Sequence, residues 1–129
     1  MIKLAAFIYA GLAGVLFGFQ ISLALGAPLG HLAMGGQWPG VLPDGLRIAT
    51  MFQGVLIAVF ALVVLRRAGV IAKPNFPAWS IWVVLVFSTL AVIANLATPS
   101  LAERALWAPV TIAMWVSCIR VWLAGRISH

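Results

Sequence analysis

This chain has very few charged side chains: eight Lys or Arg and two Asp or Glu among 129 residues. Soluble domains are about one quarter charged, and a small domain has a large surface to cover. With 64% hydrophobic residues, the composition excludes an ordinary soluble domain. It also excludes a disordered tail, a coiled coil and a disulfide-stapled secreted module. An integral membrane protein remains.

Cysteine and histidine are almost absent, with one Cys and two His. The single thiol, Cys118, excludes an intrachain disulfide. His31 and His129 fall on opposite sides of the membrane in the topology below, so they cannot share a metal or a haem. The sequence also has no glycine-rich phosphate loop and no paired nucleophile and base. We therefore expect no cofactor and no metal, and we do not expect an enzyme.

Four apolar runs are what the sequence does contain: residues 4–25, 48–65, 78–97 and 105–123. About 20 apolar residues are needed for a helix to cross a bilayer core of about 30 Å. The runs are apolar on all sides rather than alternating, which favours helices over strands. We predict an all-α fold, a single four-transmembrane-helix bundle over residues 1–129. The first run is longer than the apolar core of a signal peptide, about 7–15 residues, so retention is favoured over cleavage.

The basic residues are distributed unevenly between the two sides of this bundle. The side with both termini carries six of them: Lys3, Arg66, Arg67, Lys73, Arg120 and Arg126. The other side carries Arg47 and Arg104 together with both acids, Asp44 and Glu103. The positive-inside rule therefore predicts that both termini are cytoplasmic. Because topology explains the basic excess, no nucleic-acid partner is expected. No acid lies within a span, which disfavours a proton-coupled antiporter.

The connection between the first two runs, residues 26–47, is long and rich in glycine and proline. These residues forbid a regular helix, yet the segment keeps several large apolar side chains. We predict an ordered loop that caps the outer face, because long ordered loops are often functional. The alternative is a simple interfacial loop anchored by Trp38.

The few polar residues gather on the same outer face. Ser100-x-x-Glu103 is a capping-box pattern that predicts a helix start near Leu101, and Asp44 is placed to N-cap the second span. Because charges partly removed from water need partners, we expect a structural ion cluster rather than a catalytic one. Its expected members are Asp44, Arg47, Glu103 and Arg104, with His31 as a further possible member.

Two other groups of residues point to helix packing or to a pocket. The first span has a small-residue stripe, Ala10, Gly14, Gly18 and Ser22, within a longer four-residue repeat. Such stripes favour close helix packing within the monomer, the alternative being a homodimer interface or a substrate path.

The amides Gln20, Gln53 and Asn95 lie in the outer half of the spans. They favour bonds between helices, the alternative being a shallow polar pocket beneath the cap. The expected pocket or cap residues are His31, Trp38, Gln53, Asn95 and Trp107.

Two motifs carry a resemblance to known proteins: GAPxG…GGxxPGxLPxxLR from Gly26 to Arg47, and ERxxWxP from Glu103 to Pro109. On these motifs the chain resembles small bacterial four-helix integral membrane proteins of uncharacterised function. The resemblance covers the whole chain and implies fold and location. It carries over no catalytic residue.

Three hypotheses about function follow. The first is a non-enzymatic accessory or interaction protein of the plasma membrane, whose partners are membrane lipid and either a second copy or a larger membrane complex. The second is a binder or carrier of a small lipophilic molecule in the apolar bundle beneath the outer loop. An enzyme is the weakest, since only Glu103, Asp44 and His31 offer an acid or base and each has a simpler role.

Overall fold

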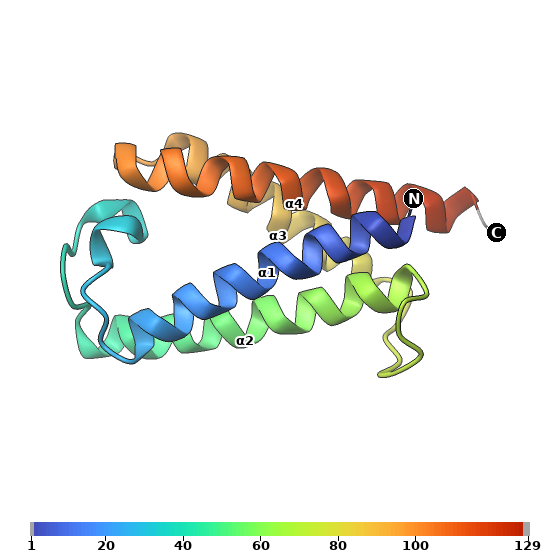
Figure 1. Cartoon of the computed structure of the whole chain (residues 1–129), viewed down its shortest axis with the longest axis horizontal. Helices are drawn as coiled ribbons and strands as arrows, with labels where there is room; N and C mark the ends of the chain where they lie inside the picture. Colours follow the sequence, from blue (N-terminus) through green and yellow to red (C-terminus); the bar gives the residue numbers. More distant parts are fainter. Residues whose placement is uncertain (1, 128–129) are drawn as a thin grey trace.

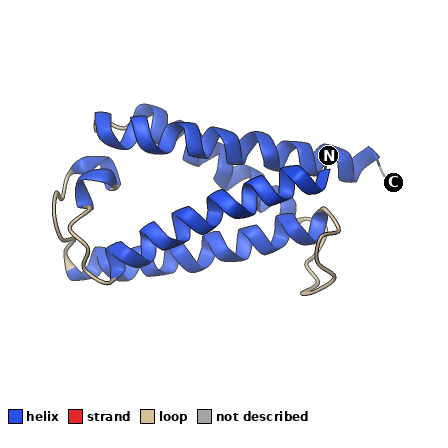
Figure 2. Ribbon diagram, viewed as in Figure 1, coloured by secondary structure: helices blue, strands red, loops and turns tan. Residues whose placement is uncertain are grey.

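The computed structural model describes residues 2–127, and in that range it is all-helical without strands. Four long helices make up the chain: α1 (Ile2–Ala24), α2 (Asp44–Arg67), α3 (Ser80–Ala97) and α4 (Leu101–Ile127) (Figures 1 and 2). Each is long and apolar enough to cross a membrane. The shortest, α3, has 18 residues, or about 27 Å at 1.5 Å per residue. The four predicted spans are confirmed, although α2 and α4 extend beyond their apolar runs at both ends.

The helices form two hairpins, α1–α2 and α3–α4, which are joined because α1 also packs along α4. In contrast, α2 and α3 have few contacts with each other. The bundle is therefore closed where α1 meets α4 and loosely joined between α2 and α3. One end, here called the basic end, holds the start of α1, the end of α4 and the 68–79 connection (Figure 1). The opposite end, the cap end, holds the connection between α1 and α2.

The hydrophobic core is concentrated in the half of the bundle nearest the basic end. There α1 contributes Ala5, Ala6, Tyr9 and Ala13, whose mostly small side chains let the neighbouring helices approach closely. Toward the cap end the two hairpins move apart (Figure 1). A second, smaller core closes that end, built on Leu23, Ala33 and Leu42. The chain thus has two cores with a less filled region between them.

The connection between α1 and α2 is an ordered cap, as predicted. We call residues 25–43 the cap loop; it contains two short 3₁₀ turns, η1 (Gly30–Leu32) and η2 (Met34–Gly36). The Gly30 amide donates to the Gly40 carbonyl at 2.9 Å, which ties the two sides of the loop together. A Cβ at Gly30 would lie 1.8 Å from the Trp38 carbonyl oxygen, so only glycine permits this approach. Trp38 itself is exposed.

The prediction that the small-residue stripe of α1 packs within the monomer is wrong. Gly14 and Gly18 are exposed, and a Cβ built on either would meet no atom within 4 Å. Ala10 is half-buried, and the Ser22 hydroxyl donates to the Gly18 carbonyl of its own helix. The buried face of α1 is the neighbouring one, where alanines and Tyr9 lie. The glycine that allows close packing between these two helices is Gly54 of α2, which is buried against α1.

Candidate functional site

A cleft runs between the two hairpins, from the main core to the underside of the cap loop. It consists of two adjoining cavities of about 240 Å³ and 320 Å³. Both cavities share wall residues from all four helices, namely Leu16, Gln53, Ile57, Ala91 and Thr111. The larger cavity falls at the lower end of the range of ligand pockets, about 300–1,000 Å³. We call the two together the interhelical cleft.

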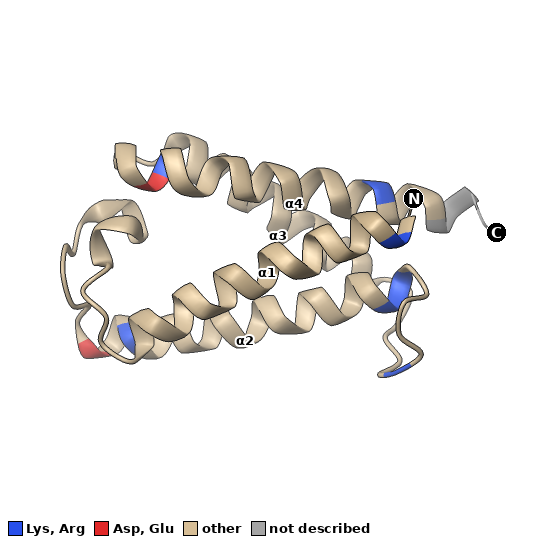
Figure 3. Cartoon of the chain, in the orientation of Figure 1, with Lys and Arg blue, Asp and Glu red and all other residues tan. Residues whose placement is uncertain are grey.

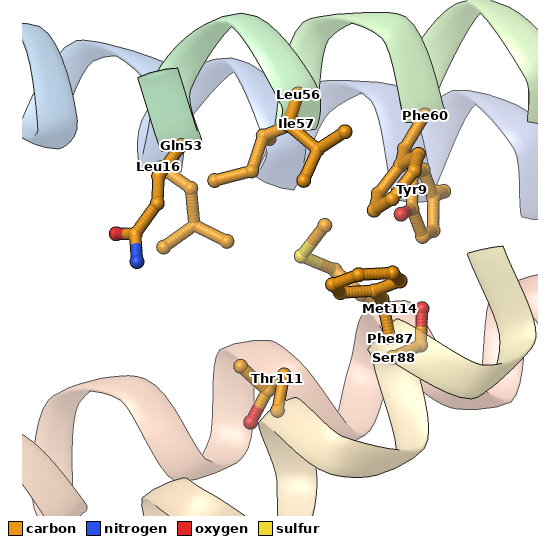
Figure 4. Close-up of a pocket in the computed structure, with 11 residues that line it drawn as sticks. Tyr9, Leu16, Gln53, Leu56, Ile57, Phe60, Phe87, Ser88, Thr111 and Met114 are labelled. Carbon is orange, nitrogen blue, oxygen red and sulfur yellow. The ribbon is translucent and has the colours of Figure 1, made fainter. Parts of the chain in front are cut away.

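The half of the cleft nearest the basic end is apolar. Its wall includes Tyr9, Phe60, Phe87 and Met114, which converge on one space in Figure 4. The rings of Phe60 on α2 and Phe87 on α3 lie 5.3 Å apart, and they join the two loosely packed helices. Phe87 is 47% exposed, so this contact lies at the surface of the bundle. The cleft is therefore bordered on its α2–α3 side by side chains that face the lipid.

The half of the cleft nearest the cap carries more polar side chains, among them three amides and one carboxylate. Gln20, Gln53, Asn95 and Glu103 contribute side chains from four different helices. The Gln20 Oε1 atom is buried and has no hydrogen-bond partner. The Asn95 amide nitrogen donates to the Ala91 carbonyl of its own helix at 2.8 Å, so the expected bond to a neighbouring helix is absent. The Asn95 oxygen is left as an acceptor.

Three hydrogen bonds hold the cap loop over this polar half. The Trp107 indole nitrogen donates to the Leu32 carbonyl at 2.9 Å. The Gly35 amide donates to the Glu103 carboxylate, also at 2.9 Å, and the Ser100 hydroxyl donates to the His31 carbonyl at 3.2 Å. All three partners belong to α4 or to the residue before it. The first turn of α4 and the cap loop are thus one fixed unit.

The predicted ion cluster is not formed. Among residues 2–127 there is a single ion pair, Arg47–Asp44 at 3.8 Å, and the Asp44 side chain is 99% exposed. The Arg47 Nε atom donates to the Ala24 carbonyl at 3.0 Å, and an Arg104 nitrogen donates to the Thr98 carbonyl at 2.6 Å. Arg104 thus binds a backbone carbonyl rather than an acid, and Arg47 binds a carbonyl in addition to the exposed Asp44. A carbonyl at a helix end has no intrahelical donor, which explains why it attracts a guanidinium.

The expected helix caps are half confirmed. The α4 helix begins at Leu101, and the Glu103 amide donates to the Ser100 hydroxyl at 3.2 Å, as a capping box requires. The reciprocal half is missing, because the Glu103 carboxylate accepts from Gly35 instead. Asp44 is not the N-cap of α2: Pro43 holds that position and Asp44 is the first helical residue. Its charge still lies favourably at the positive end of the helix.

The structure brings some of the expected pocket residues together and separates others. Gln53, Asn95 and Trp107 all line the cleft, whereas the side chains of His31 and Trp38 are exposed outside it. The aromatic wall of Tyr9 and Phe87 was not anticipated from the sequence. No signal distinguishes these side chains from lipid-facing ones, because α1 and α3 are predominantly apolar on all faces.

Comparisons with known proteins add no further constraint: no protein-family model matches the chain, and neither does any curated protein or solved structure.

Proposed function

We propose that this chain is a non-enzymatic, multi-pass membrane protein that binds a lipophilic molecule in the interhelical cleft. The observation that carries the proposal is the polarity of this cleft. It is apolar and aromatic near the main core, and beneath the cap loop it carries the carboxylate of Glu103 and the amides of Gln20, Gln53 and Asn95. Such a gradient suits an amphipathic ligand with its apolar body at Phe60 and Phe87 and its polar end at Gln20 and Glu103.

The balance of charge favours a ligand whose polar end donates hydrogen bonds or is positively charged. The Glu103 side chain is buried, with 8% exposure, and its carboxylate accepts only the Gly35 amide among the described residues. Its sequence neighbour Arg104 is bonded to the Thr98 carbonyl. A buried carboxylate without a cation is stabilised by a donor or an ammonium group. The unpartnered Gln20 oxygen lies in the same wall and favours the same ligand class.

The same proposal places the chain in a bacterial plasma membrane with the cap end outward. The positive-inside distribution supports this orientation, and so does the resemblance to small bacterial membrane proteins. The proposal includes no catalytic step. Glu103 is engaged with the cap loop, while Asp44 and His31 are exposed away from the cleft. These three groups do not converge on one reacting position, as acid–base chemistry requires.

The test compares twelve-carbon probes that differ only in their polar end: dodecylamine, dodecanol and dodecanoate. Binding to the full chain in a neutral detergent is followed by the rise of the thermal unfolding midpoint. We expect dodecylamine to bind most tightly and dodecanoate least. Glu103→Gln should weaken dodecylamine binding by about tenfold or more, because a hydrogen bond to a charged group contributes about 1.5–3 kcal/mol.

Asp44→Asn is the matched control, since it removes the only other acid, which lies at the same end but outside the cleft. It should leave dodecylamine affinity unchanged to within about twofold, as expected for an exposed charge. Equal effects of Asp44→Asn and Glu103→Gln would show that the probe responds to overall charge and would refute the site. Tightest binding of dodecanoate would refute the ligand class.

A second candidate function, an accessory or interaction protein, is favoured by one separate observation. The exposed face of α1 carries Gly14 and Gly18 with open space above each Cα. Glycines on a lipid-facing surface allow another helix to approach closely, from a second copy or from a larger complex. Gentle solubilisation followed by mass spectrometry tests this candidate. A partner that is retained by the natural chain and lost in Gly14→Leu/Gly18→Leu would support it, and purification of a bare monomer would not.

A further inference from the structure

The basic end of the bundle has cations but no acidic side chain. Both acids of the chain, Asp44 and Glu103, lie at the cap end, in the first turns of α2 and α4. Figure 3 shows this separation: the red acidic positions lie at the cap end, and among the coloured residues only basic positions mark the opposite end. Arg66 and Arg67 in the last turn of α2 therefore have no carboxylate partner there. Among the described residues, nothing supplies a negative charge to these two arginines.

A pocket of about 550 Å³ lies where these two arginines meet the start of α3. The two ends of the 68–79 connection contribute to its wall, with Ala68 and Gly69 after α2 and Phe76, Pro77 and Ala78 before α3. Both arginines line it, and the Nε atom of each is buried without a hydrogen-bond partner. One further nitrogen of Arg66 donates to the Asn75 side chain at 3.2 Å. Buried donors without acceptors are unfavourable, so the two Nε atoms favour an acceptor in this pocket.

The start of α3 adds to the positive potential of the pocket. Ser80 and Ile81, the first two residues of the helix, line it. The N-terminal end of a helix carries a partial positive charge and attracts anions. The Ser80 amide is already bonded to the Pro77 carbonyl at 3.0 Å, so the contribution of the helix is its dipole and the Ser80 hydroxyl. Two arginine side chains and a helix start thus line one cavity.

We propose that this pocket binds the phosphate group of an anionic phospholipid. A guanidinium matches a phosphate through parallel hydrogen bonds, and basic pockets between membrane helices bind anionic headgroups. The remaining walls favour a lipid over a free anion, because Ile2, Val63 and Phe76 are apolar. Trp79 beside the pocket is 64% exposed, as expected for a residue at the membrane interface. The site is separate from the interhelical cleft and does not depend on its ligand.

The test measures binding of phosphatidylglycerol, phosphatidylcholine and inorganic phosphate to the full chain in detergent. The readouts are the shift in thermal unfolding midpoint and the lipid retained per chain by mass spectrometry. Measurements are made at about 1 M salt, where the Debye length falls to about 3 Å and long-range attraction is screened. We expect saturable binding of phosphatidylglycerol and much weaker binding of the other two probes.

The decisive comparison is Arg66→Gln/Arg67→Gln against Lys3→Gln/Lys73→Gln. Both variants remove two charges from the basic end, but the two lysines do not line the pocket. The arginine variant should bind phosphatidylglycerol about tenfold more weakly or worse, and the lysine variant should match the natural chain to within about twofold. If the arginine variant does not fold, Arg66→Lys/Arg67→Lys replaces it and should show a smaller loss, because it keeps charge but not the planar fork.

Three results would overturn the proposal. Equal loss in the arginine and lysine variants would mean that only overall charge matters. Equal binding of phosphatidylcholine would mean that the pocket does not select an anionic headgroup. Equal stabilisation by inorganic phosphate would overturn the lipid as the occupant and assign the pocket to free phosphate.

Discussion

The Gly30→Ala substitution tests whether the cap loop is a fixed lid. A methyl group at this position would lie 1.8 Å from the Trp38 carbonyl oxygen and 2.7 Å from the Gly40 carbonyl oxygen. Ordinary contact begins near 3.4 Å, and both neighbours are backbone atoms that have no rotamer to change. The two sides of the loop must therefore separate, which breaks the 2.9 Å bond between the Gly30 amide and the Gly40 carbonyl.

The expected cost is on the order of 3 kcal/mol. A buried donor or acceptor left unsatisfied costs about 1–3 kcal/mol. Part of the docking of the cap on α4 is lost as well, since the Trp107 bond to Leu32 depends on the same loop geometry. A loss of this size corresponds to an increase of about a hundredfold in the opening equilibrium of the cap. Hydrogen–deuterium exchange of the 25–43 segment measures that opening directly.

The matched control is Gly45→Ala, in the first turn of α2, where an added Cβ meets nothing within 4 Å. Its exchange over the cap loop should equal that of the natural chain. If Gly30→Ala and Gly45→Ala exchange alike, the close approach of the loop backbone is not what holds the cap, and the reasoning fails.

Three further substitutions test other contacts of the fold. Trp107→Phe keeps a ring against Phe19 but loses the indole bond to the Leu32 carbonyl. Exchange in the cap loop should therefore rise by about tenfold, and unchanged exchange would contradict a role for this bond. Arg47→Ala removes the donor to the Ala24 carbonyl at the end of α1. The free energy of unfolding in detergent should fall by about 1–3 kcal/mol. An unaltered melting curve would contradict a stabilising role for this hydrogen bond. Gly54→Leu should destabilise the α1–α2 hairpin by several kcal/mol, because a Cβ at Gly54 would lie 3.3 Å from an α1 side chain. In contrast, Gly18→Leu should leave the monomer stable. Equal thermal midpoints for the two leucine variants would show that α1 and α2 do not pack as described.

The four helices were predictable because long apolar runs leave few alternatives in a membrane. A polar backbone group cannot remain unbonded in lipid, so a long run without charge forms a helix. The ends were less accurate. The α2 helix begins at Asp44, before its apolar run at residue 48, and α4 begins at Leu101, which the capping box predicted but the apolar run at residue 105 did not. The first turns of α2 and α4 are helical, although their residues are too polar to be counted within a membrane span.

The inward face of each helix could not be predicted in the same way. In a soluble helix, polar residues mark the outer face, but here lipid and protein interior favour the same apolar side chains. Gly14 and Gly18 of α1 follow a packing motif and yet are exposed, while Ala6 and Ala13 are buried beside them. Small residues do let a neighbouring helix approach closely, but within this chain no helix approaches Gly14 and Gly18.

The role of Glu103 was also beyond sequence reasoning. The pattern Ser100-x-x-Glu103 correctly predicted the helix start, but the carboxylate binds the amide of Gly35, 68 residues away. A hydrogen bond to a backbone amide cannot be predicted from residue types, because nearly every residue has that amide. The expectation of an ion cluster failed for the same reason, since Arg47 and Arg104 found backbone carbonyls, which every residue offers.

The two ends of the cleft suggest how a ligand would enter. The cap loop is held to α4 by several hydrogen bonds and by a buried core of its own, so opening it would break many contacts together. The α2–α3 side is held by few contacts, among them the contact of the buried Phe60 with the exposed Phe87. An aromatic pair contributes only about 0.5–1.5 kcal/mol beyond its buried area. Separation of α2 and α3 is therefore the easier motion, and it opens the cleft toward the acyl chains of the bilayer. A site that opens to lipid rather than to water selects a lipophilic ligand by its route of entry as well as by its walls.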